Sequence, residues 1–390
     1  MIANLQFNSP SDPSIDLLII AGEASGDEHG SLLLEDLASS HPHLKCAAIG
    51  GPHLEKKGAF LVYPLVKHAV VGVIEVLKHY RTFKQIFSNT IEWIKEHKPK
   101  AVLLIDYPGF NLRLARELQK IGISEKGGGQ VKIIQYISPQ LWAWKPKRRF
   151  LMEQVLDGLG VIFPFEVECY KDTRLPVSFV GHPFTKSNYI SPVHYESDGP
   201  LLLLPGSRRQ PVERILPILL DAYEQLLILY PNLPVQIPVP DSRIRIVVDK
   251  IVSKRNNLKD NIQVVEAGKI LVAKAAMMSS GTMSLSCAMA GIPGLIAYRA
   301  HPLTYFLGRI LVKVPYLGMA NILIPDNPPY PEFIQHNANG RNLSQSMANI
   351  LRDTQARIQA ERNAKKLFAC LTSAKQKSTV DWLVQEASLT

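Results

Sequence analysis

Cysteine is scarce in this chain of 390 residues, which holds only four. The four lie far apart and form no Cys-x-x-Cys pair: Cys46, Cys169, Cys287 and Cys370. Without paired or clustered spacing, the sequence disfavours both a disulfide framework and a structural zinc site. We therefore expect buried, reduced thiols, no bound metal and no cofactor.

Long apolar runs are also missing, because none approaches the ~20 residues that a membrane-spanning helix needs. Residues 1–7 lack the basic start and the apolar stretch of a signal peptide. Internal repeats and low-complexity tracts are absent as well. These absences argue against an integral membrane protein and a repeat protein, and they predict a protein that stays in the cytoplasm.

Nucleic-acid-binding motifs are absent, although lysine and arginine give the chain a net charge of +10. The basic residues are scattered, and the clusters at 145–149 and 208–209 are too short for a basic arm. Such a charge balance suits an anionic membrane surface together with an anionic ligand. A nucleic-acid binder is an outside alternative, which a salt-dependent DNA shift would reveal.

What the chain does contain is an alternation of continuous apolar strands and amphipathic helices. Strands are expected at residues 15–21, 46–49, 101–105, 131–137, 200–204, 235–239, 262–265 and 275–279. Helices are expected at residues 29–39, 91–97, 112–121 and 283–290. This pattern predicts an α/β fold with parallel sheets covered on both faces. Ligands bind such sheets at the carboxyl ends of the strands, where residues 22–27, 106–111 and 138–144 should meet.

The length of the chain exceeds one ordinary core and fits two domains. We expect a first domain over residues 1–185 and a polar, proline-containing linker over residues 186–199. A second α/β domain should follow over residues 200–352. The remaining residues, 353–390, are expected to form one long helix, from about 353 to 387, that crosses back onto the first domain.

Aromatic and basic residues coincide in the loop at 138–149, which follows an expected strand. Trp142 and Trp144 are half of the chain's four tryptophans, and the basic cluster follows them at once. Pro139 and Pro146 disfavour helix at the residues before them. Rings beside cations suit a site for an anionic or sugar-bearing ligand, but a surface loop with snorkelling tryptophans explains the composition equally well.

Two strand-to-helix turns in the second domain are suited to phosphate. Residues 205–209 place Arg208 beside the backbone amides of a helix start, where a bidentate contact to phosphate is available. Residues 279–282 form a second turn whose small side chains let a diphosphate approach the next helix. An ordinary βα turn and a plain helix cap at Ser280 or Thr282 are the alternatives.

The loop at residues 136–145, YISPQLWAWK, resembles the signature loop of the lipid-A-disaccharide synthase family. Further segments that resemble the family follow in the same order: AGEASGD at 21–27, VGVIEVL at 71–77, IDYPGFN at 105–111, FVGHP at 179–183, LLPGSR at 203–208, SGT at 280–282 and YR at 298–299. Each segment alone is weak, but their shared order along most of the chain makes the resemblance strong.

The resemblance implies two doubly wound Rossmann-like domains that face each other across a cleft, the glycosyltransferase-B arrangement. It implies an inverting transfer from UDP-2,3-diacylglucosamine to 2,3-diacylglucosamine 1-phosphate (lipid X), which yields the β-1,6-linked lipid A disaccharide 1-phosphate and UDP. The first domain would bind the acceptor and the membrane, and the second would bind the UDP-sugar. The implied partners are both substrates and, peripherally, the inner leaflet of the cytoplasmic membrane, with a homodimer as an open option.

Site residues follow from this resemblance together with the strand-end pattern. Asp106 is the candidate general base, with a helix cap as its alternative role, and Asp27 is a weaker second candidate. Arg208 and the turn at 281–282 would stabilise the departing UDP. Candidate UDP-binding residues are Gly206, Ser207, Arg208, Ser280, Gly281, Thr282 and Ser286. Candidate substrate-binding residues are Glu23, Ser25, Asp27, Trp144, Arg299 and Asn321.

The sequence departs from the family at two positions. Ser286 stands where family members usually carry a glutamate suited to grip the ribose of uridine, and Gly109 stands where they often carry an aspartate. Two alternatives therefore stay open. One is another UDP-sugar enzyme of this architecture, such as a MurG-like transferase or an epimerase, which a donor-specificity test would separate. The other is a non-catalytic sugar-nucleotide binder, which would bind UDP without turnover.

Two apolar segments with basic residues are candidate membrane surfaces. The segment at 69–78 is followed by His79, Arg81 and Lys84, and the segment at 303–317 contains Arg309 and Lys313. Apolar and basic residues together suit an element that dips into the head-group region of an anionic leaflet. Packing within an ordinary βα unit is the alternative.

Overall fold

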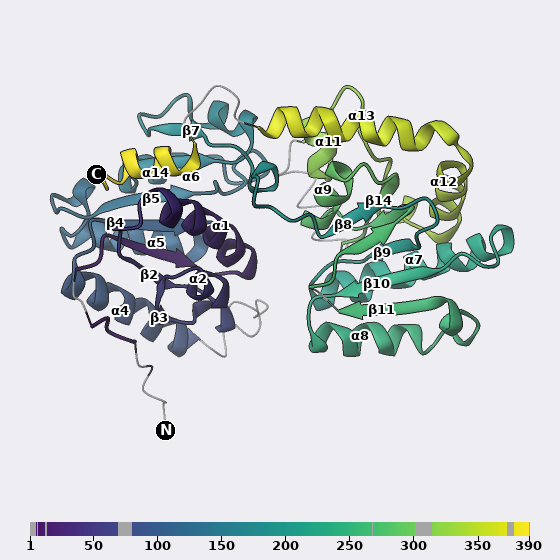
Figure 1. The fold of residues 1–390 in the computed structure, drawn as a ribbon, viewed down its shortest axis with the longest axis horizontal. Coiled ribbons are helices and arrows are strands. Elements are labelled where there is room, and N and C mark those ends of the chain that lie inside the picture. Colours follow the sequence, from purple (N-terminus) through teal and green to yellow (C-terminus); the bar gives the residue numbers. More distant parts are fainter. Residues whose placement is uncertain are drawn as a thin grey trace. The chain divides into compact units, whose positions relative to one another are not determined.

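The computed structural model describes residues 5, 7–11, 14–68, 80–266, 268–300, 314–372 and 378–389. The chain divides into two compact units (Figure 1). Unit 1 comprises Met1–Tyr189 together with Leu371–Thr390, and unit 2 comprises Ile190–Cys370. The chain therefore passes from one unit to the other at residues 189–190 and again at 370–371.

Unit 1 is built on a seven-stranded sheet with the order β3-β2-β1-β4-β5-β6-β7, in which all neighbouring strands are parallel. Its strands are β1 (Leu17–Ala21), β2 (Cys46–Ile49), β3 (Phe60–Tyr63), β4 (Ala101–Ile105), β5 (Lys132–Tyr136), β6 (Gly158–Val161) and β7 (Val177–Phe179). Every residue of β1 and β4 is buried, which explains why these segments are apolar throughout instead of alternating. The strand order reverses between β1 and β4, and doubly wound sheets bind ligands at such a reversal.

Helices cover this sheet and connect its strands in the usual βαβ manner (Figure 1). They are α1 (Ala24–Ser40), α2 (Pro52–Lys56), α4 (Tyr80–His97), α5 (Pro108–Lys120), α6 (Arg148–Val155) and α14 (Thr379–Glu386). Two of them begin earlier than the sequence predicted. Helix α1 begins at residue 24 instead of 29, and its glycines allow close packing, since a Cβ at Gly30 would lie 2.6 Å from Ile105 Cδ1. Helix α5 begins at Pro108, because proline is favoured in the first turn of a helix.

Unit 2 repeats the architecture with a six-stranded sheet of order β11-β10-β9-β13-β14-β15. Its strands are β9 (Leu201–Leu204), β10 (Val235–Val239), β11 (Ile262–Glu266), β13 (Ala275–Met278), β14 (Gly294–Tyr298) and β15 (Glu332–Ile334), with a separate pair of β8 (Val193–Tyr195) and β12 (Leu271–Ala273). Its helices are α7 (Arg209–Leu229), α8 (Ser242–Val252), α9 (Thr282–Met289), α11 (Met319–Leu323), α12 (Gly340–Arg352) and α13 (Thr354–Leu371). The predicted α/β class with two Rossmann-like units is confirmed.

The C-terminal segment differs from the single long helix that the sequence predicted, because it contains two helices, α13 and α14. Ser378 starts the second one: its Oγ accepts a hydrogen bond from the Asp381 amide at 3.0 Å, and Asp381 Oδ2 accepts from the Ser378 amide at 3.3 Å. This reciprocal capping box satisfies donors at a new helix start. Helix α14, yellow in Figure 1, folds as part of unit 1.

The two candidate membrane segments fall largely outside the described residues, which exclude 69–79 and 301–313. Of the basic residues beside the first segment, Arg81 and Lys84 are described, and both are exposed on α4. Within the described ranges, no helix combines the length and the apolar character that crossing a bilayer requires.

Candidate active site

The carboxyl edge of the unit 1 sheet brings together groups that are far apart in the sequence. Glu23 follows β1, Asp106 follows β4, Trp142 follows β5 and Glu166 follows β6. Strands β1, β4, β5 and β6 are consecutive neighbours in the sheet, so the segments that leave them start along one edge. The prediction that residues 22–27, 106–111 and 138–144 lie at this edge therefore agrees with the strand order.

Asp106 is held in an unusual backbone conformation at the end of β4. Both Asp106 and Tyr107 have positive φ angles, 44° and 45°, in the left-handed region that residues other than glycine rarely adopt. The Asp106 amide donates to Tyr136 O at 3.1 Å, and Asn111 Nδ2 donates to Asp106 O at 2.8 Å. The ring of Tyr107 occupies the space beside Gly22, where a Cβ would lie 2.0 Å from its Cδ1. These contacts hold the Asp106 backbone in place at the strand end.

The electrostatic surroundings make Asp106 a stronger base than an exposed aspartate. Burial and the negative charge of nearby Glu23 raise the pKa of Asp106 to about 6, against the opposing effect of the Tyr107 amide. The alternative role of Asp106 as a helix cap does not apply, because the N-cap of α5 is Tyr107 and that helix has no side-chain cap. A carboxylate with a pKa close to neutral is well matched to general-base catalysis.

Glu166 is a second acidic group at this edge, and the sequence did not predict it. It lies in the short 3₁₀-helix η3 (Pro164–Tyr170), is 2% exposed, and its Oε2 accepts from the Phe163 amide at 3.2 Å. Burial raises the pKa of Glu166 to about 8, the Phe163 amide and the Trp142 indole oppose this rise, and the charge of Asp106 adds to it. In the sequence, Glu166 is the single charged residue in the apolar run at 161–167, which indicates a buried acid. The sequence does not place it after a strand, because the two glycines of β6 are unfavourable in strands.

The buried Asn111 Oδ1, in the first turns of α5, has no hydrogen-bond partner among the described residues. Buried polar groups are usually paired with protein or water. An acceptor is therefore available to a polar ligand at this edge.

The predicted residues of the first turn occupy different environments. Glu23 is half-buried at the N-cap of α1 and Ser25 is exposed. Asp27 is completely buried, and its carboxylate accepts from the amides of Gly51 at 2.9 Å and His53 at 2.9 Å, so it caps α2. This corrects the interpretation of Asp27 as a substrate ligand or second base, because its oxygens are used inside the protein.

The two tryptophans of the loop after β5 also differ in environment. Trp142 is half-buried and its ring meets Phe165 edge-on, with ring centroids 5.6 Å apart. Trp144 is 45% exposed, and Lys145 Nζ lies 4.4 Å from the centroid of its ring. A contact of Trp144 with substrate remains a prediction.

In unit 2 the two predicted phosphate turns lie side by side at the carboxyl edge of β9 and β13, which are neighbouring strands. Gly206 has a φ of +117°, which favours glycine, and a Cβ there would lie 3.5 Å from Ser279 Oγ. The Ser279 amide donates to Leu204 O at 2.8 Å. The turns at 205–208 and 279–282 are therefore in contact, and Arg299 follows the next strand, β14.

Both turns end in helix starts suited to an anion. Arg208 is the N-cap of α7 and Gly281 is the N-cap of α9, and neither helix has a side-chain cap. Ser207, Arg208, Gly281 and Thr282 are exposed, and Ser280 is half-buried. Uncapped first-turn amides with the positive end of the helix dipole form an anion-binding arrangement, to which an arginine adds charge.

Two other residues of unit 2 that the sequence predicted to bind a ligand are buried inside the protein. Asn321 is completely buried: its Nδ2 donates to Tyr330 O at 2.8 Å and its Oδ1 accepts from the Tyr330 amide at 3.0 Å. This corrects the interpretation of Asn321 as a sugar or phosphate ligand, since its amide is used to hold the chain at 330. Ser286 is 3% exposed on α9 and offers little surface to a ribose.

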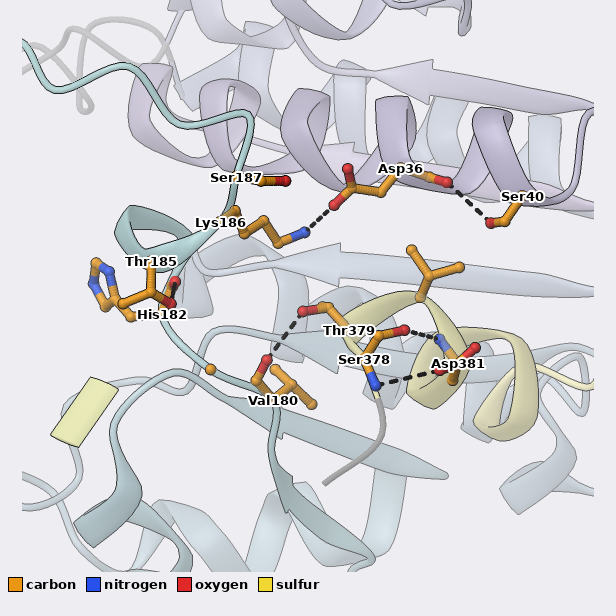
Figure 2. Close-up of a pocket in the computed structure, with 12 residues that line it drawn as sticks. Asp36, Ser40, Val180, His182, Thr185, Lys186, Ser187, Ser378, Thr379 and Asp381 are labelled. Atoms are coloured by element: carbon orange, nitrogen blue, oxygen red, sulfur yellow. Dashed lines mark hydrogen bonds and ion pairs between the residues drawn. The ribbon is translucent and has the colours of Figure 1, made fainter. Parts of the chain in front are cut away.

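A cavity of about 450 Å³ lies elsewhere in unit 1, between α1, the segment at 180–187 and the start of α14 (Figure 2). Lys186 Nζ and Asp36 Oδ2 form an ion pair of 2.7 Å on its wall, and Thr379 Oγ1 donates to Val180 O at 3.0 Å. The polar groups of this cavity thus bind one another, and no predicted site residue lines it. In the part of the chain that the structure describes, no group of three or more His, Cys, Asp and Glu side chains is placed to hold a metal ion.

Comparisons with known proteins show the family of this chain. A family model described as Lipid-A-disaccharide synthetase matches residues 17–386. Lipid-A-disaccharide synthase 1 of Legionella pneumophila strain Philadelphia 1 is 35% identical over 386 residues, which are 95% of this chain and 97% of the relative. Lipid-A-disaccharide synthase of Coxiella burnetii strain Dugway is 32% identical and covers 86% of this chain and 88% of the relative.

Solved structures share the fold at much lower identity. The glycotransferase of kitacinnamycin aligns with a TM-score of 0.63 and 12% identity, over 97% of this chain and 100% of that one. UDP-GlcNAc 2-epimerase of Neisseria meningitidis, bound to UDP-GlcNAc, aligns with a TM-score of 0.57 and 13% identity, over 96% of this chain and 99% of that one. Transferases and epimerases both occur among these neighbours, so the fold alone does not separate the two activities.

Proposed function

Because the chain belongs to the lipid-A-disaccharide synthase family of UDP-sugar-dependent glycosyltransferases, we propose that it joins UDP-2,3-diacylglucosamine to 2,3-diacylglucosamine 1-phosphate. The products are the β-1,6-linked disaccharide 1-phosphate of lipid A biosynthesis and UDP. The α-linked donor gives a β-linked product, so the configuration inverts in one displacement. Such a displacement needs a base beside the acceptor hydroxyl and a stabilised leaving group.

Asp106 is the proposed base. Its carboxylate would take the proton of the acceptor 6-hydroxyl as that oxygen attacks the anomeric carbon and the bond to UDP breaks. The observation that carries this assignment is the position of Asp106 at a strand end, in a backbone conformation held by Tyr136 and Asn111, with a pKa raised to about 6. Above that pKa the group is ionised, yet it is a stronger base than an exposed aspartate. Glu23 and Ser25, at the end of the neighbouring strand, are the proposed acceptor contacts.

The two turns of unit 2 are the proposed site of the diphosphate. Amides at the starts of α7 and α9, with Ser207, Ser280 and Thr282 around them, would bind phosphate oxygens. Arg208 would add a charge-assisted contact that strengthens as negative charge collects on departing UDP. Gly206 allows the approach of the two turns, and Arg299 is the proposed contact from β14. Ser286 would make at most a weak contact with the ribose, because it is buried on α9.

The acyl chains of both substrates give a physical reason for peripheral association with the inner leaflet of the cytoplasmic membrane. Each methylene moved into water costs about 0.8 kcal/mol, so diacylated sugars stay in a leaflet. The enzyme would therefore meet its substrates at the membrane surface. The net charge of +10 favours an anionic leaflet.

The reaction is tested by incubating the purified protein with both acylated substrates in detergent and EDTA and analysing the products by mass spectrometry. We expect the disaccharide 1-phosphate and UDP in equal amounts, and UDP-GlcNAc should not replace the acylated donor. UDP binding without any disaccharide would contradict the proposed function and would instead support a sugar-nucleotide binder.

A further inference from the structure

An aromatic and basic surface, exposed except for the half-buried Arg148, lies at the same edge of unit 1 as Asp106. We call it the Trp144 surface and define it by Trp144, Lys145, Lys147, Arg148 and Phe150, at the end of the loop after β5 and the start of α6. Trp144 is 45% exposed and Phe150 is 40% exposed. Lys145 Nζ lies 4.4 Å and Arg148 Cζ lies 5.7 Å from the centroid of the Trp144 ring.

Among the described residues, three cations of this surface have no acidic partner. None of the described carboxylates forms an ion pair with Lys145, Lys147 or Arg148. Arg149, by contrast, is bound by Asp172 through two contacts, Nε to Oδ1 at 2.6 Å and Nη2 to Oδ2 at 2.5 Å. The first turn of α6 carries no acidic residue, so the positive end of its dipole adds to the cations instead of being offset.

We propose that the Trp144 surface docks on an anionic phospholipid leaflet, with the rings among the glycerol groups and the cations against lipid phosphates. The proposal rests on the proposed function, because acylated substrates require a membrane-facing surface. Beyond that function, the proposal names the part of the chain that faces the membrane. Strand β5, which leads into the surface, is hydrogen-bonded to β4, which leads into Asp106. Docking here would therefore bring the edge that carries the proposed base to the leaflet that holds the acceptor.

A lipid leaflet accounts for both features of the surface, whereas a single soluble anion accounts for only one. A free phosphate would use the cations and leave two exposed rings without a role. Aromatic rings with an apolar body favour the membrane–water interface, and lysine and arginine beside them meet the phosphates of the same interface. The absence of acids among the five defining residues fits a negatively charged partner.

The first experiment measures binding of the full chain to phosphatidylcholine vesicles with and without phosphatidylglycerol. One variant combines Lys145→Ser, Lys147→Ser and Arg148→Ser. Its control combines Lys250→Ser, Lys254→Ser and Lys269→Ser, three exposed lysines of unit 2 with the same loss of charge. Each cation near an anionic surface contributes about fivefold to binding, so we expect roughly a hundredfold loss for the first variant. Equal losses in both variants would overturn the proposal, because they would show only a general effect of net charge.

A second experiment uses the tryptophan itself as the reporter. Trp93 and Trp382 are buried and Trp142 is half-buried, so Trp144 is the most exposed of the four indoles. We expect vesicles that contain brominated phosphatidylglycerol to quench its fluorescence and Trp144→Phe to abolish that quenching. Quenching that is unchanged in Trp144→Phe, or competition by soluble glycerol phosphate at the same concentration as the lipid, would contradict docking on a leaflet.

Phe150→Ala separates this proposal from the proposed function. The exposed ring of Phe150 belongs to no part of the proposed reaction site, so transfer in detergent should be unchanged while vesicle binding weakens severalfold. The matched control is Ile246→Ala, which removes a 69% exposed side chain from α8. Normal vesicle binding by Phe150→Ala would contradict the proposal that the Trp144 surface docks on a leaflet. Absence of disaccharide from the wild-type protein would instead refute the proposed reaction, and the vesicle measurements would still decide the docking.

Discussion

Among single residues, Asp106 controls the expected pH dependence of transfer. In the proposed reaction its carboxylate is the base, and burial with the charge of Glu23 raises the pKa of Asp106 to about 6. The value of kcat/KM should therefore be constant above that pH and fall about tenfold for each pH unit below it. Glu23→Gln removes the neighbouring negative charge and should move the midpoint to lower pH. A midpoint near 4 in the wild-type protein would contradict this account of Asp106.

Glu166 should affect the stability of the protein in the opposite direction from a salt-bridged acid. The pKa of Glu166 in the folded state is about 8, well above the 4.5 of an ordinary glutamate, so the folded state binds the extra proton between these two pH values. The free energy of unfolding should therefore decrease as the pH rises from about 4.5 to 8. Glu166→Gln should remove much of this decrease and stabilise the protein at pH 8 by roughly 1 kcal/mol or more.

Denaturant unfolding at pH 5 and pH 8 measures this effect. The control is Glu168→Gln, on the same 3₁₀-helix, whose side chain is 69% exposed. It should leave the pH dependence unchanged. If Glu166→Gln destabilises the protein equally at both pH values, then Glu166 contributes as an ionised, hydrogen-bonded group and the raised pKa is wrong.

Single-residue roles could be predicted only in part from the sequence. In a sequence, a polar residue near the start of a helix looks the same whether it binds a ligand or the protein's own backbone. Asp27 and Asn321 belong to the second class, and only the contacts of Asp27 with the start of α2 and of Asn321 with Tyr330 reveal it. Glu166 was missed because its importance depends on burial, which residue spacing does not encode.

Among the helices and strands, the docking of α14 on β6 depends on a glycine. A Cβ at Gly160 would lie 2.7 Å from Cη2 of Trp382, so Gly160→Ala must displace a large, buried ring. We expect a loss of about 1–3 kcal/mol in the free energy of unfolding, typical of overpacking. Trp382→Ala should lower the free energy of unfolding by about 3–5 kcal/mol. In the Trp382→Ala background the ring is gone, so Gly160→Ala should destabilise the protein less than it does in the wild type.

Denaturant melts of this double-mutant cycle provide the test. Gly109→Ala is the control, because a Cβ at that helical glycine would meet nothing within 4 Å. It should be neutral or slightly stabilising. Additive losses from Gly160→Ala and Trp382→Ala would show that the two residues do not pack together.

The elements that the sequence predicted well are those whose signal is local. Strands β4 and β10 match their predicted bounds, because apolar runs bordered by breakers specify buried strands. Strand β6 was missed, since its sequence GLGV pairs two glycines that accommodate Trp382 and Glu386 from the distant α14. Helices α1 and α5 begin earlier than the sequence predicts, because glycine and proline in first turns resemble loop signals.

At the level of the whole molecule, unit 1 is completed by residues from the end of the chain. Ending the chain at residue 370 would remove α14 and expose the glycine face of β6. We expect the unfolding transition of unit 1 to shift to markedly lower denaturant while unit 2 still binds UDP. Denaturant melts measure the stability of unit 1, and isothermal titration calorimetry measures the binding of UDP to unit 2. Loss of UDP binding together with the destabilisation would contradict the independence of the two units.

Length and strand pattern were enough to predict two Rossmann-like units, because each needs its own core and continuous apolar strands. The return of the C-terminal residues to unit 1 was expected, but the break between α13 and α14 was not. The start of α14 is fixed by the reciprocal bonds of Ser378 and Asp381, a capping pattern that is short and common in sequences.

The most direct test of the account is the single-turnover rate of disaccharide formation by Asp106→Asn, measured beside its UDP affinity. The substitution keeps the size of the side chain and removes the base. We expect the rate to fall by a factor of about 10² to 10⁴ with UDP affinity unchanged, while the exposed Asp249→Asn behaves as wild type. A near-normal rate in Asp106→Asn would contradict the central claim that this carboxylate at the end of β4 activates the acceptor.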